Sequence, residues 1–414
     1  MKQFKIITFS IIIYSSATYA TPNFAREYSV DCTTCHTMIP TLNLTGKNFL
    51  RNGFRFSKND TPTLKKIISP QESDNRPIPL AVMLNSNYDN QDKEWHEKVK
   101  FYTGGTISKN ISFFGLTKDT FNSNKDDSQE FFTQSSSRAY LQFNFAEDKH
   151  VSRIGIISPL TQFGNIIKIS ADSGLKGNNG IESQDNKNDN GKENHSIQER
   201  NENIKGNKKG KEDEKGNSSN EKVEGNQHYK TPLQNASIEN IKGIEYSYLF
   251  SKNIMFLFSY GEQVKENGND KSLIEDEDNY QITGGVKYNY YNGYSISFIY
   301  NKFKKNGIEN ESFLIPIEKE FDKVHLLSTL IYKDTTDNEE EYYGIENTII
   351  YPFSNGDYIR GVINLDRQDG DSNYGFSLTY SKVYKNALFH LTGARKVTPN
   401  DNENILLGSF SLLF

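Results

Sequence analysis

Two cysteines and a histidine form the most reactive group in the sequence. The chain contains only two cysteines, and they stand in Cys32-Thr33-Thr34-Cys35-His36. The C-x-x-C-H pattern is the signature of covalent attachment of c-type haem. The two thiols add to the two vinyl groups of the porphyrin, and the adjacent histidine reaches the iron from the proximal side, where histidine is a usual ligand. The sequence therefore predicts one covalent haem c on Cys32 and Cys35, with His36 as an axial ligand of its iron.

Three other uses of paired cysteines fit the sequence less well. A thioredoxin-type redox pair needs a βαβ context, and no such pattern follows the motif. A zinc site needs two further ligands close by, whereas the next histidine after His36 is His96. A structural disulfide would leave His36 unexplained. An exported chain with no other cysteine favours haem attachment.

The second axial ligand is less obvious than the first. Met38 is too close to His36 to reach the opposite face of the porphyrin. Met83 is the candidate, because it lies on the first predicted strand, on the same face as Asn85 and Asn87. A competing interpretation is that Met83 only packs against the N-terminal segment. A methionine ligand would raise the redox potential relative to two histidine ligands. The other histidines considered as ligands are His96, His325 and His390.

The residues around the motif divide into an export signal and a small haem-carrying segment. Residues 1–20 have a basic start, a short apolar core and small residues before a cleavage site after Ala20, which is the layout of a signal peptide. Residues 21–76 form the haem attachment segment. Within it, Pro40 to Gly53 predicts one helix, begun by the proline and ended by the glycine. The segment has too little apolar mass to cover both faces of a haem, so it needs shelter from the rest of the chain.

From residue 77 to residue 414 the sequence alternates with a period of two. Apolar and aromatic side chains occupy one face and small or polar side chains the other, as in Tyr374-Gly375-Phe376-Ser377. This pattern is typical of outer-membrane β-barrels, whose apolar face meets lipid. A soluble β-sandwich would show the same alternation, but the export signal and a last strand that ends in Phe414 favour the barrel. The predicted fold is an all-β, antiparallel transmembrane barrel with a small N-terminal α-helical haem segment.

The number of strands is predicted to be about sixteen. Both chain ends should lie in the periplasm, which requires an even number. Tight turns and longer connections alternate along the chain, as expected for periplasmic turns and outer loops. The weakest strand is 310–318, because Pro316 cannot donate to a neighbouring strand; fourteen and eighteen strands stay open as alternatives. The predicted strands are residues 78–88, 97–108, 110–118, 135–146, 150–158, 238–250, 253–262, 278–290, 293–303, 310–318, 322–333, 341–351, 357–367, 373–383, 386–396 and 403–414.

Composition narrows the remaining choices. Residues 172–234 hold almost no apolar side chains, so they should form a disordered third outer loop. The whole chain has 48 basic and 53 acidic side chains, a balance that argues against a nucleic-acid partner. After the N-terminus there is no run of about 18 apolar residues, which excludes a membrane-spanning helix there. An apolar content of 35% with 13% aromatic residues is unusual for one large soluble core.

The N-terminal residues resemble a known family. The matching stretches are Pro-Asn-Phe-Ala-Arg-Glu-Tyr at 22–28, the cysteine motif at 32–36, Pro-Thr-Leu-Asn at 40–43, Gly-Lys-Asn-Phe at 46–49 and Asn-Gly-Phe at 52–54. They resemble the fused monohaem c-type cytochrome-porins of the outer membrane, a family that includes the proposed iron oxidases of iron-oxidising bacteria. The resemblance covers about residues 22–55, and the barrel matches only in architecture and length. It implies a haem that plugs or lines a sixteen-stranded barrel and electron transfer across the outer membrane.

These observations lead to one expected function and two alternatives. The expected function is electron transfer across the Gram-negative outer membrane, with the haem segment on the periplasmic side or in the lumen. The expected partners are outer-membrane lipid, a periplasmic electron carrier and an extracellular donor such as ferrous iron. The first alternative is a diffusion porin whose haem is structural or sensory. The second is a haem enzyme that acts at an open iron site. No catalytic side chain is predicted, and the donor, acceptor and direction of transfer stay open.

Overall fold

The structure is a computed structural model of the chain. The predicted signal peptide at residues 1–20, the last residue Phe414, and the predicted disordered loop at 172–234 apart from residue 232 lie outside the described residues. The described residues are 23–38, 41–69, 79–89, 94–121, 133–163, 232, 236, 238–264, 279–290, 293–305, 307–321, 323–335, 340–353, 356–368, 370–384, 387–399 and 402–413.

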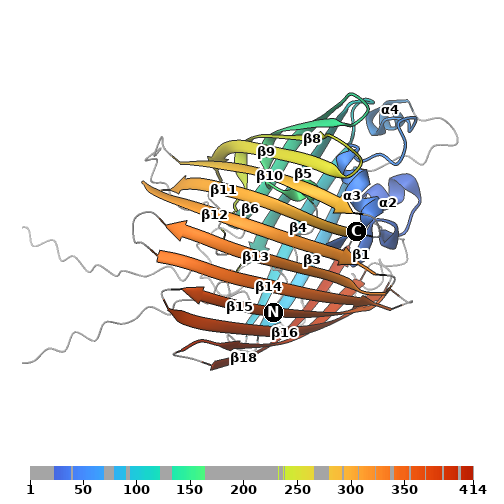
Figure 1. The fold of residues 1–414 in the computed structure, drawn as a ribbon. Coiled ribbons are helices and arrows are strands. Elements are labelled where there is room, and N and C mark those ends of the chain that lie inside the picture. The colour runs from blue at the N-terminus through green and yellow to red at the C-terminus, as the bar shows by residue number, and fades with distance from the viewer. Residues whose placement is uncertain are drawn as a thin grey trace, which may run out of the picture. The chain divides into compact units, whose positions relative to one another are not determined.

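Sixteen strands form a closed antiparallel barrel in which every strand pairs with its neighbours in the chain and the last pairs with the first (Figure 1). The predicted fold class and strand number are confirmed, and each predicted boundary lies within three residues of the observed one. The strands are β3 (Leu80–Asp89), β4 (Glu94–Thr106), β5 (Ile111–Phe121), β6 (Thr133–Phe145), β7 (His150–Ile157), β8 (Ile241–Leu249), β9 (Ile254–Gln263), β10 (Tyr280–Tyr290), β11 (Tyr294–Lys305), β12 (Ile308–Glu320), β13 (His325–Thr335), β14 (Glu340–Pro352), β15 (Tyr358–Gln368), β16 (Asp371–Tyr384), β17 (Ala387–Val397) and β18 (Asn402–Leu413).

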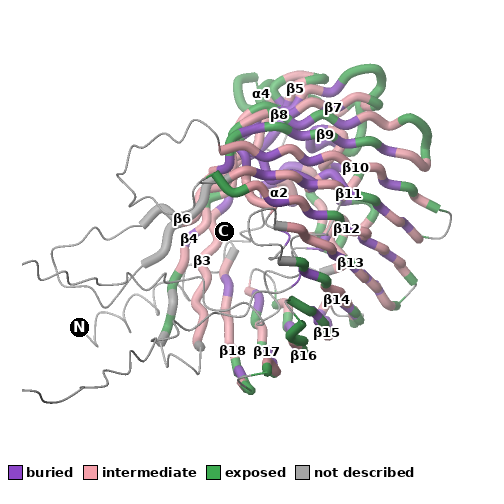
Figure 2. The backbone as a smooth tube through the Cα atoms, turned by 60° about the vertical axis from the view of Figure 1, so that its left-hand side comes forward, coloured by how far each residue is buried: buried purple, intermediate pink, exposed green. Residues whose placement is uncertain are grey.

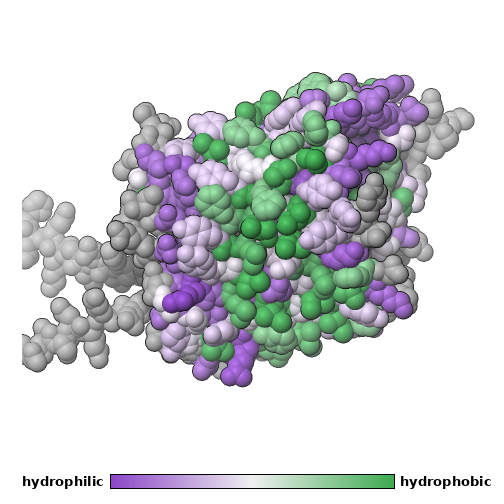
Figure 3. All heavy atoms as spheres, viewed as in Figure 1, coloured by the Kyte–Doolittle hydropathy of each residue, from purple (hydrophilic) through white to green (hydrophobic). Residues whose placement is uncertain are grey.

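The predicted alternation of faces is also observed. On β9, Phe256, Phe258 and Tyr260 are exposed on the outside, whereas Met255 and Leu257 are buried inside. Figure 2 shows the same alternation of buried and exposed positions along most strands. Figure 3 shows apolar side chains gathered in a band across the middle of the strands, with hydrophilic side chains toward both ends. An apolar outer band of this kind is what a barrel presents to lipid.

Pro316 lies within β12 and interrupts the sheet on one side only. Toward β13 the pairing runs through Pro316 and Thr329. Toward β11 the paired positions pass from Ile317 to Leu314, in unchanged register. Proline lacks the N–H donor that a ladder needs, so it weakens one of the two ladders without displacing the strand. The predicted strand 310–318, the weakest of the sixteen predictions, is therefore part of the closed barrel.

The two ends of the barrel differ. We call the end where β3 begins and β18 ends the near end. The connections between strands there are short: the shortest is residues 385–386 and the longest is residues 353–357. At the opposite, far end, the connections vary from two residues, at 306–307 and 369–370, to residues 158–240 between β7 and β8. The predicted alternation of tight turns and longer connections therefore holds only in part. The N-terminal helices lie at the near end (Figure 1). Among the described residues, no helix is long and apolar enough to cross a membrane.

The N-terminal segment, residues 23–69, holds short elements rather than one long helix. They are α2 (Asn23–Tyr28), the 3₁₀ turn η1 (Cys32–Thr34), β1 (His36–Met38), β2 (Thr41–Leu42), α3 (Leu44–Arg51) and α4 (Thr63–Ile68). The predicted helix from Pro40 to Gly53 was wrong at its start, because Thr41 and Leu42 pair with β1 and Asn43 caps α3. Its predicted end was close, since Gly53 follows the helix with a φ of 70°.

Inside the barrel, the chain after β7 turns inward. It forms the 3₁₀ turn η2 (Thr161–Phe163), where Leu160 and Phe163 are each 1% exposed. These side chains pack with inward-facing apolar residues of the wall, among them Leu257 and Ile299. The inner face was predicted to be largely small or polar. The part of the inner face that contacts η2 is apolar instead, because η2 covers it and excludes water.

Candidate haem-attachment site

The two cysteines lie in one tight turn. The Cys35 amide donates to the Cys32 carbonyl at 3.2 Å, and the Thr34 amide donates to Asp31 at 3.0 Å. Both thiols are free and half-buried. Burial raises the pKa of the Cys32 thiol, and the nearby Asp31 carboxylate adds to this effect. Burial likewise raises the pKa of Cys35. His36 follows directly as the first residue of β1.

Asn43 fixes this turn against the start of α3. Its side-chain nitrogen donates to the carbonyls of Thr33 at 3.2 Å and Thr34 at 3.1 Å, and its backbone amide donates to Cys35 at 3.0 Å. Its side-chain oxygen accepts from the Gly46 amide at 2.9 Å, which makes Asn43 the N-cap of α3. One side chain therefore holds both the cysteine turn and the helix. Sequence reasoning missed this role, although an asparagine just before a helix is a known start signal.

Gly46 allows the turn and the helix to approach closely. A Cβ atom at this position would lie 2.1 Å from the Cys35 carbonyl oxygen and 2.9 Å from a methyl carbon of Leu42. The first contact is with backbone, so no change of side-chain rotamer can relieve it. Glycine is therefore required here for close packing, not for an unusual backbone angle.

We expect Gly46→Ala to push the cysteine turn away from α3. The predicted cost is about 3 kcal/mol, at the upper end of what overpacking usually costs. It can be measured as a lower denaturant concentration at which the N-terminal segment becomes sensitive to protease. Gly361→Ala is the matched control, because a Cβ at Gly361 meets no atom within 4 Å. Equal behaviour of the two variants would contradict the close packing.

Aromatic rings attach the segment to the inner wall. The ring of Phe24 stacks on Phe54 at 4.8 Å between centroids, Phe54 stacks on Phe114 of β5 at 5.9 Å, and Phe114 stacks on Tyr140 of β6 at 5.5 Å. Phe49 of α3 is 7% exposed and belongs to the same buried cluster. These rings pack the N-terminal segment against inward-facing residues of the barrel.

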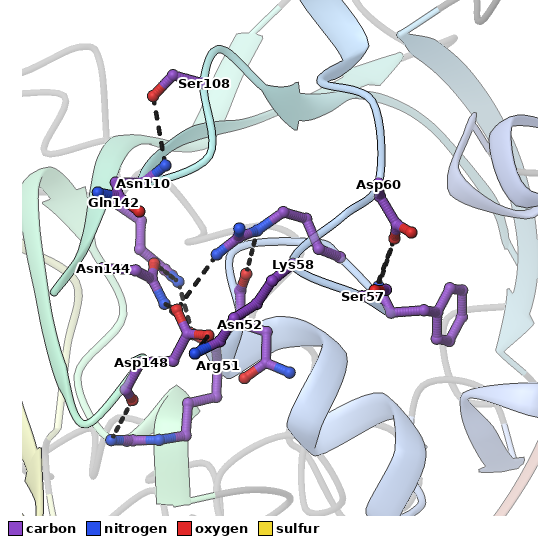
Figure 4. A network of polar contacts seen from close by, with 12 residues as sticks. Arg51, Asn52, Ser57, Lys58, Asp60, Ser108, Asn110, Gln142, Asn144 and Asp148 are labelled. Atoms are coloured by element: carbon purple, nitrogen blue, oxygen red, sulfur yellow. Dashed lines mark hydrogen bonds and ion pairs between the residues drawn. The ribbon is translucent and has the colours of Figure 1, made fainter. Parts of the chain in front are cut away.

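Arg51 at the end of α3 is the main polar attachment (Figure 4). Its guanidinium donates to the carbonyls of Asp148 at 3.2 Å and Lys149 at 2.9 Å in the turn between β6 and β7. It also donates to the Ser247 hydroxyl at 3.1 Å. Its own carbonyl accepts from the side chains of Gln142 at 2.9 Å and Asn144 at 2.8 Å. Burial lowers the pKa of Arg51 to about 10, so it stays charged at neutral pH.

Lys47 attaches the other side of α3. Its ammonium lies 2.6 Å from a carboxylate oxygen of Glu318 on β12. The same carboxylate contacts His325 of β13 at 2.8 Å and Lys287 of β10 at 3.6 Å. Arg51 reaches β8 and Lys47 reaches β12, which lies four strands further along the sheet, so α3 lies against the inner wall between them. Glu318 lies two residues before the end of β12, so the helix sits at the near end.

The helix also touches the inward turn η2. Arg51 donates to the side-chain oxygen of Gln162 at 3.4 Å, and the Ser247 hydroxyl donates to the same oxygen at 2.6 Å. Lys287 donates to the Phe163 carbonyl at 2.7 Å. The near end of the lumen is thus occupied by the N-terminal segment together with the start of the third outer loop. No sequence signal indicated this contact.

The candidates for the second axial ligand lie on different parts of the wall. The Met83 sulfur, on the inward face of β3, accepts from the Tyr102 hydroxyl at 3.7 Å, a contact it would have to give up to bind iron. His325 faces inward, and its Nε2 contacts Glu318. His390 contacts the Ser381 hydroxyl at 2.5 Å. The side chain of His96 lies outside the described residues. The structure tests none of these ligand assignments, so Met83 as the second axial ligand stays a prediction.

Comparison with known proteins gives similarity of fold only. No protein-family model and no curated protein matches the sequence. Among solved structures, the barrel is similar to an anion-selective porin from Comamonas acidovorans, with a TM-score of 0.49, 8% identity and coverage of 81% of this chain and 98% of the porin. It is also similar to a loop-deletion mutant of the outer membrane protein OmpT of Vibrio cholerae, with a TM-score of 0.48, 10% identity and coverage of 81% of this chain and 98% of OmpT. A mutant of the Rhodopseudomonas blastica porin has a TM-score of 0.44 and 10% identity, with coverage of 81% of this chain and 99% of the porin.

The class of the protein follows from the barrel itself. A closed antiparallel barrel of sixteen strands with an apolar outer band has the architecture of an outer-membrane porin. The protein is therefore a β-barrel of the bacterial outer-membrane type. The N-terminal segment of this barrel carries the Cys32-x-x-Cys35-His36 turn and is fixed in the near end of the lumen.

Proposed function

We propose that the protein is an outer-membrane monohaem c-type cytochrome fused to a porin-like barrel. It moves electrons between an extracellular donor and a periplasmic carrier, and ferrous iron is the donor we consider first. The observation that carries the proposal is the C-x-x-C-H turn held by Asn43 against α3, a helix that is itself fixed to the inner wall at the near end of the lumen. A motif in a loose tail would lack this fixed position relative to the membrane.

The residues present fit a covalent haem. Cys32 and Cys35 are both free thiols in one turn, so neither is consumed by a disulfide. His36 follows at once and supplies the proximal nitrogen. Leu44, the first residue of α3, is 65% exposed beside the residue that clamps the turn, which offers apolar surface to a porphyrin. When bound, the haem supplies one-electron chemistry at its iron. Met83 is the proposed second ligand.

In this proposal the protein side chains position the haem-carrying turn and take no part in the electron transfer as reactants. Asn43 and Gly46 set the distance between the cysteine turn and α3, and Arg51 and Lys47 hold that helix against the inner wall. A fixed position matters because the hydrocarbon layer is roughly 30 Å thick. A haem at the near end is too far from a particle resting on the far loops for direct exchange. A small soluble donor must therefore enter the lumen from the far side.

Proteoliposomes with an electron acceptor sealed inside test the proposal. With the near end facing inward, a small impermeant reductant added outside should reduce both the haem and an impermeant internal acceptor. A membrane-permeant reductant should reduce the haem in either orientation. Vesicles with the Cys32→Ala/Cys35→Ala variant provide the control and should leave the acceptor oxidised. Reduction of the haem without reduction of the acceptor would reject transmembrane transfer and favour the alternative, a diffusion porin with a structural or sensory haem.

A further inference from the structure

Helix α4 presents an apolar face that no described residue covers. Leu64, Ile67 and Ile68 are 38%, 42% and 71% exposed. Their spacing of three and four residues puts them on one side of the helix. They stand outside the lumen contacts of the N-terminal segment, so neither the haem proposal nor the barrel core explains them.

The opposite side of α4 is firmly attached. The Thr63 hydroxyl donates to the Glu27 carboxylate at 2.9 Å, and the Lys66 ammonium lies 3.3 Å from the same carboxylate. Lys66 also lies over the ring of Tyr28, 5.1 Å from its centroid. These contacts fix the rotation of the helix about its axis, so the apolar face cannot turn toward the protein and become buried.

The position of α4 is in line with the barrel wall. β4 continues to Thr106, but its neighbour β3 begins at Leu80, opposite Thr103. The edge of β4 beyond that point is covered by the N-terminal segment instead of a strand. The Thr106 amide donates to the Thr63 hydroxyl at 2.9 Å, and Asn23 of α2 donates to the Gly104 carbonyl at 3.1 Å. Covering an open strand edge with other chain is a common solution.

The start of α4 also meets the lipid-facing side of that wall. A Cβ at Gly105 would lie 2.8 Å from the Thr63 methyl carbon. Gly105 pairs with Phe113, Phe113 with Leu141, and Leu141 with Ile154, so the four positions form one row across β4 to β7. Leu141 and Ile154 are 42% and 54% exposed on the outer face. The row that meets lipid therefore runs directly to the first residue of α4.

We propose that the Leu64, Ile67 and Ile68 face inserts into the phospholipid leaflet at the near end of the barrel. The occupant is lipid because the face continues an outer row that already meets lipid, and a short apolar helix face beside a bilayer binds at its interface. The exposed Lys65 next to this face is suited to lipid phosphate. The insertion fixes the haem-carrying segment at the membrane surface. This inference rests on the membrane location in the proposed function, and not on the haem.

Tryptophan fluorescence in lipid vesicles tests the insertion. The single tryptophan, Trp95, is replaced by phenylalanine, and Ile68→Trp is added in the full chain. In vesicles of phosphatidylethanolamine and phosphatidylglycerol, we expect blue-shifted emission that falls when the lipid is brominated. Ile154→Trp is the reference for lipid contact, and Lys58→Trp, at a side chain that is 55% exposed, is the reference for water.

The outcomes separate this inference from the proposed function. Quenching of Ile68→Trp by brominated lipid, comparable with that of Ile154→Trp, supports insertion. Emission of Ile68→Trp that matches Lys58→Trp and is quenched by aqueous iodide overturns it, and a soluble partner would then be the occupant to seek. If Ile154→Trp itself is not quenched by brominated lipid, the membrane location of the barrel fails, and this inference fails with it. Heat-modifiable gel mobility confirms that each variant has folded.

Discussion

Replacing Cys32 and Cys35 together with alanine should abolish covalent haem. In cells with a c-type maturation system, the wild-type chain is expected to retain one haem through a denaturing gel, and the double variant none. The reason is that each vinyl group needs one thiol, and the chain has no other cysteine. The loss should be complete rather than partial, which makes haem staining of the gel a sufficient measurement.

The two threonines between the cysteines provide a matched control. Thr33 and Thr34 contribute backbone carbonyls to the Asn43 clamp, and Thr33→Ala/Thr34→Ala leaves those carbonyls in place. This control should keep full haem staining. The barrel of the cysteine variant should still show heat-modifiable mobility, because the contacts of its wall do not involve the thiols. Haem staining that persists without both cysteines would contradict the assignment.

The second large effect is expected from Arg51→Ala. This change removes hydrogen bonds to the Asp148 and Lys149 carbonyls and to the Ser247 hydroxyl. Hydrogen bonds to a charged group are worth about 1.5–3 kcal/mol each, and their energies do not add fully. A total loss of about 3 kcal/mol would raise the population in which α3 is detached roughly 100-fold. Hydrogen exchange of the α3 amides measures this population directly.

Lys58→Ala is the control for Arg51→Ala. The Lys58 ammonium lies 3.9 Å from the Asp148 carboxylate and is 55% exposed, so its ion pair is screened by water. An exposed pair of this kind contributes about 0–1 kcal/mol. Exchange from α3 should therefore change little in Lys58→Ala. Unchanged exchange in Arg51→Ala as well would mean that the aromatic contacts and Lys47 hold the helix without the arginine.

Patterns that are local in the chain predicted much of this protein. Side chains of a strand alternate between its two faces, so spacing placed Phe256 and Phe258 on one face. The export signal and the last strand then indicated that this face is the outer one. The same rule located all sixteen strands. The start of α3 was missed because Pro40 and Asn43 are both plausible start signals. The pairing of Thr41 and Leu42 with β1 decided between them.

The cysteine motif is likewise a local feature, and its chemistry could be predicted without any structure. Its setting could not. Lys47 and Glu318 are 271 residues apart in the chain, and Arg51 and Ser247 are 196 apart. Residues so distant meet only because the strands pair side by side in one curved sheet, which places β8 and β12 four strands apart on the same part of the inner wall. No periodicity in a sequence encodes which inward side chains then face a helix in the lumen.

The sequence by itself therefore determined the strands and the alternation of their faces, because each depends on neighbours along the chain. It also predicts the residues that would bind a haem. Tertiary structure decided that α3 lies against the inner wall at the near end of the lumen, that η2 folds inward onto it and that α4 continues the wall beyond β3. These features depend on closure and register. Both are properties of the whole set of paired strands, so no single segment reveals them.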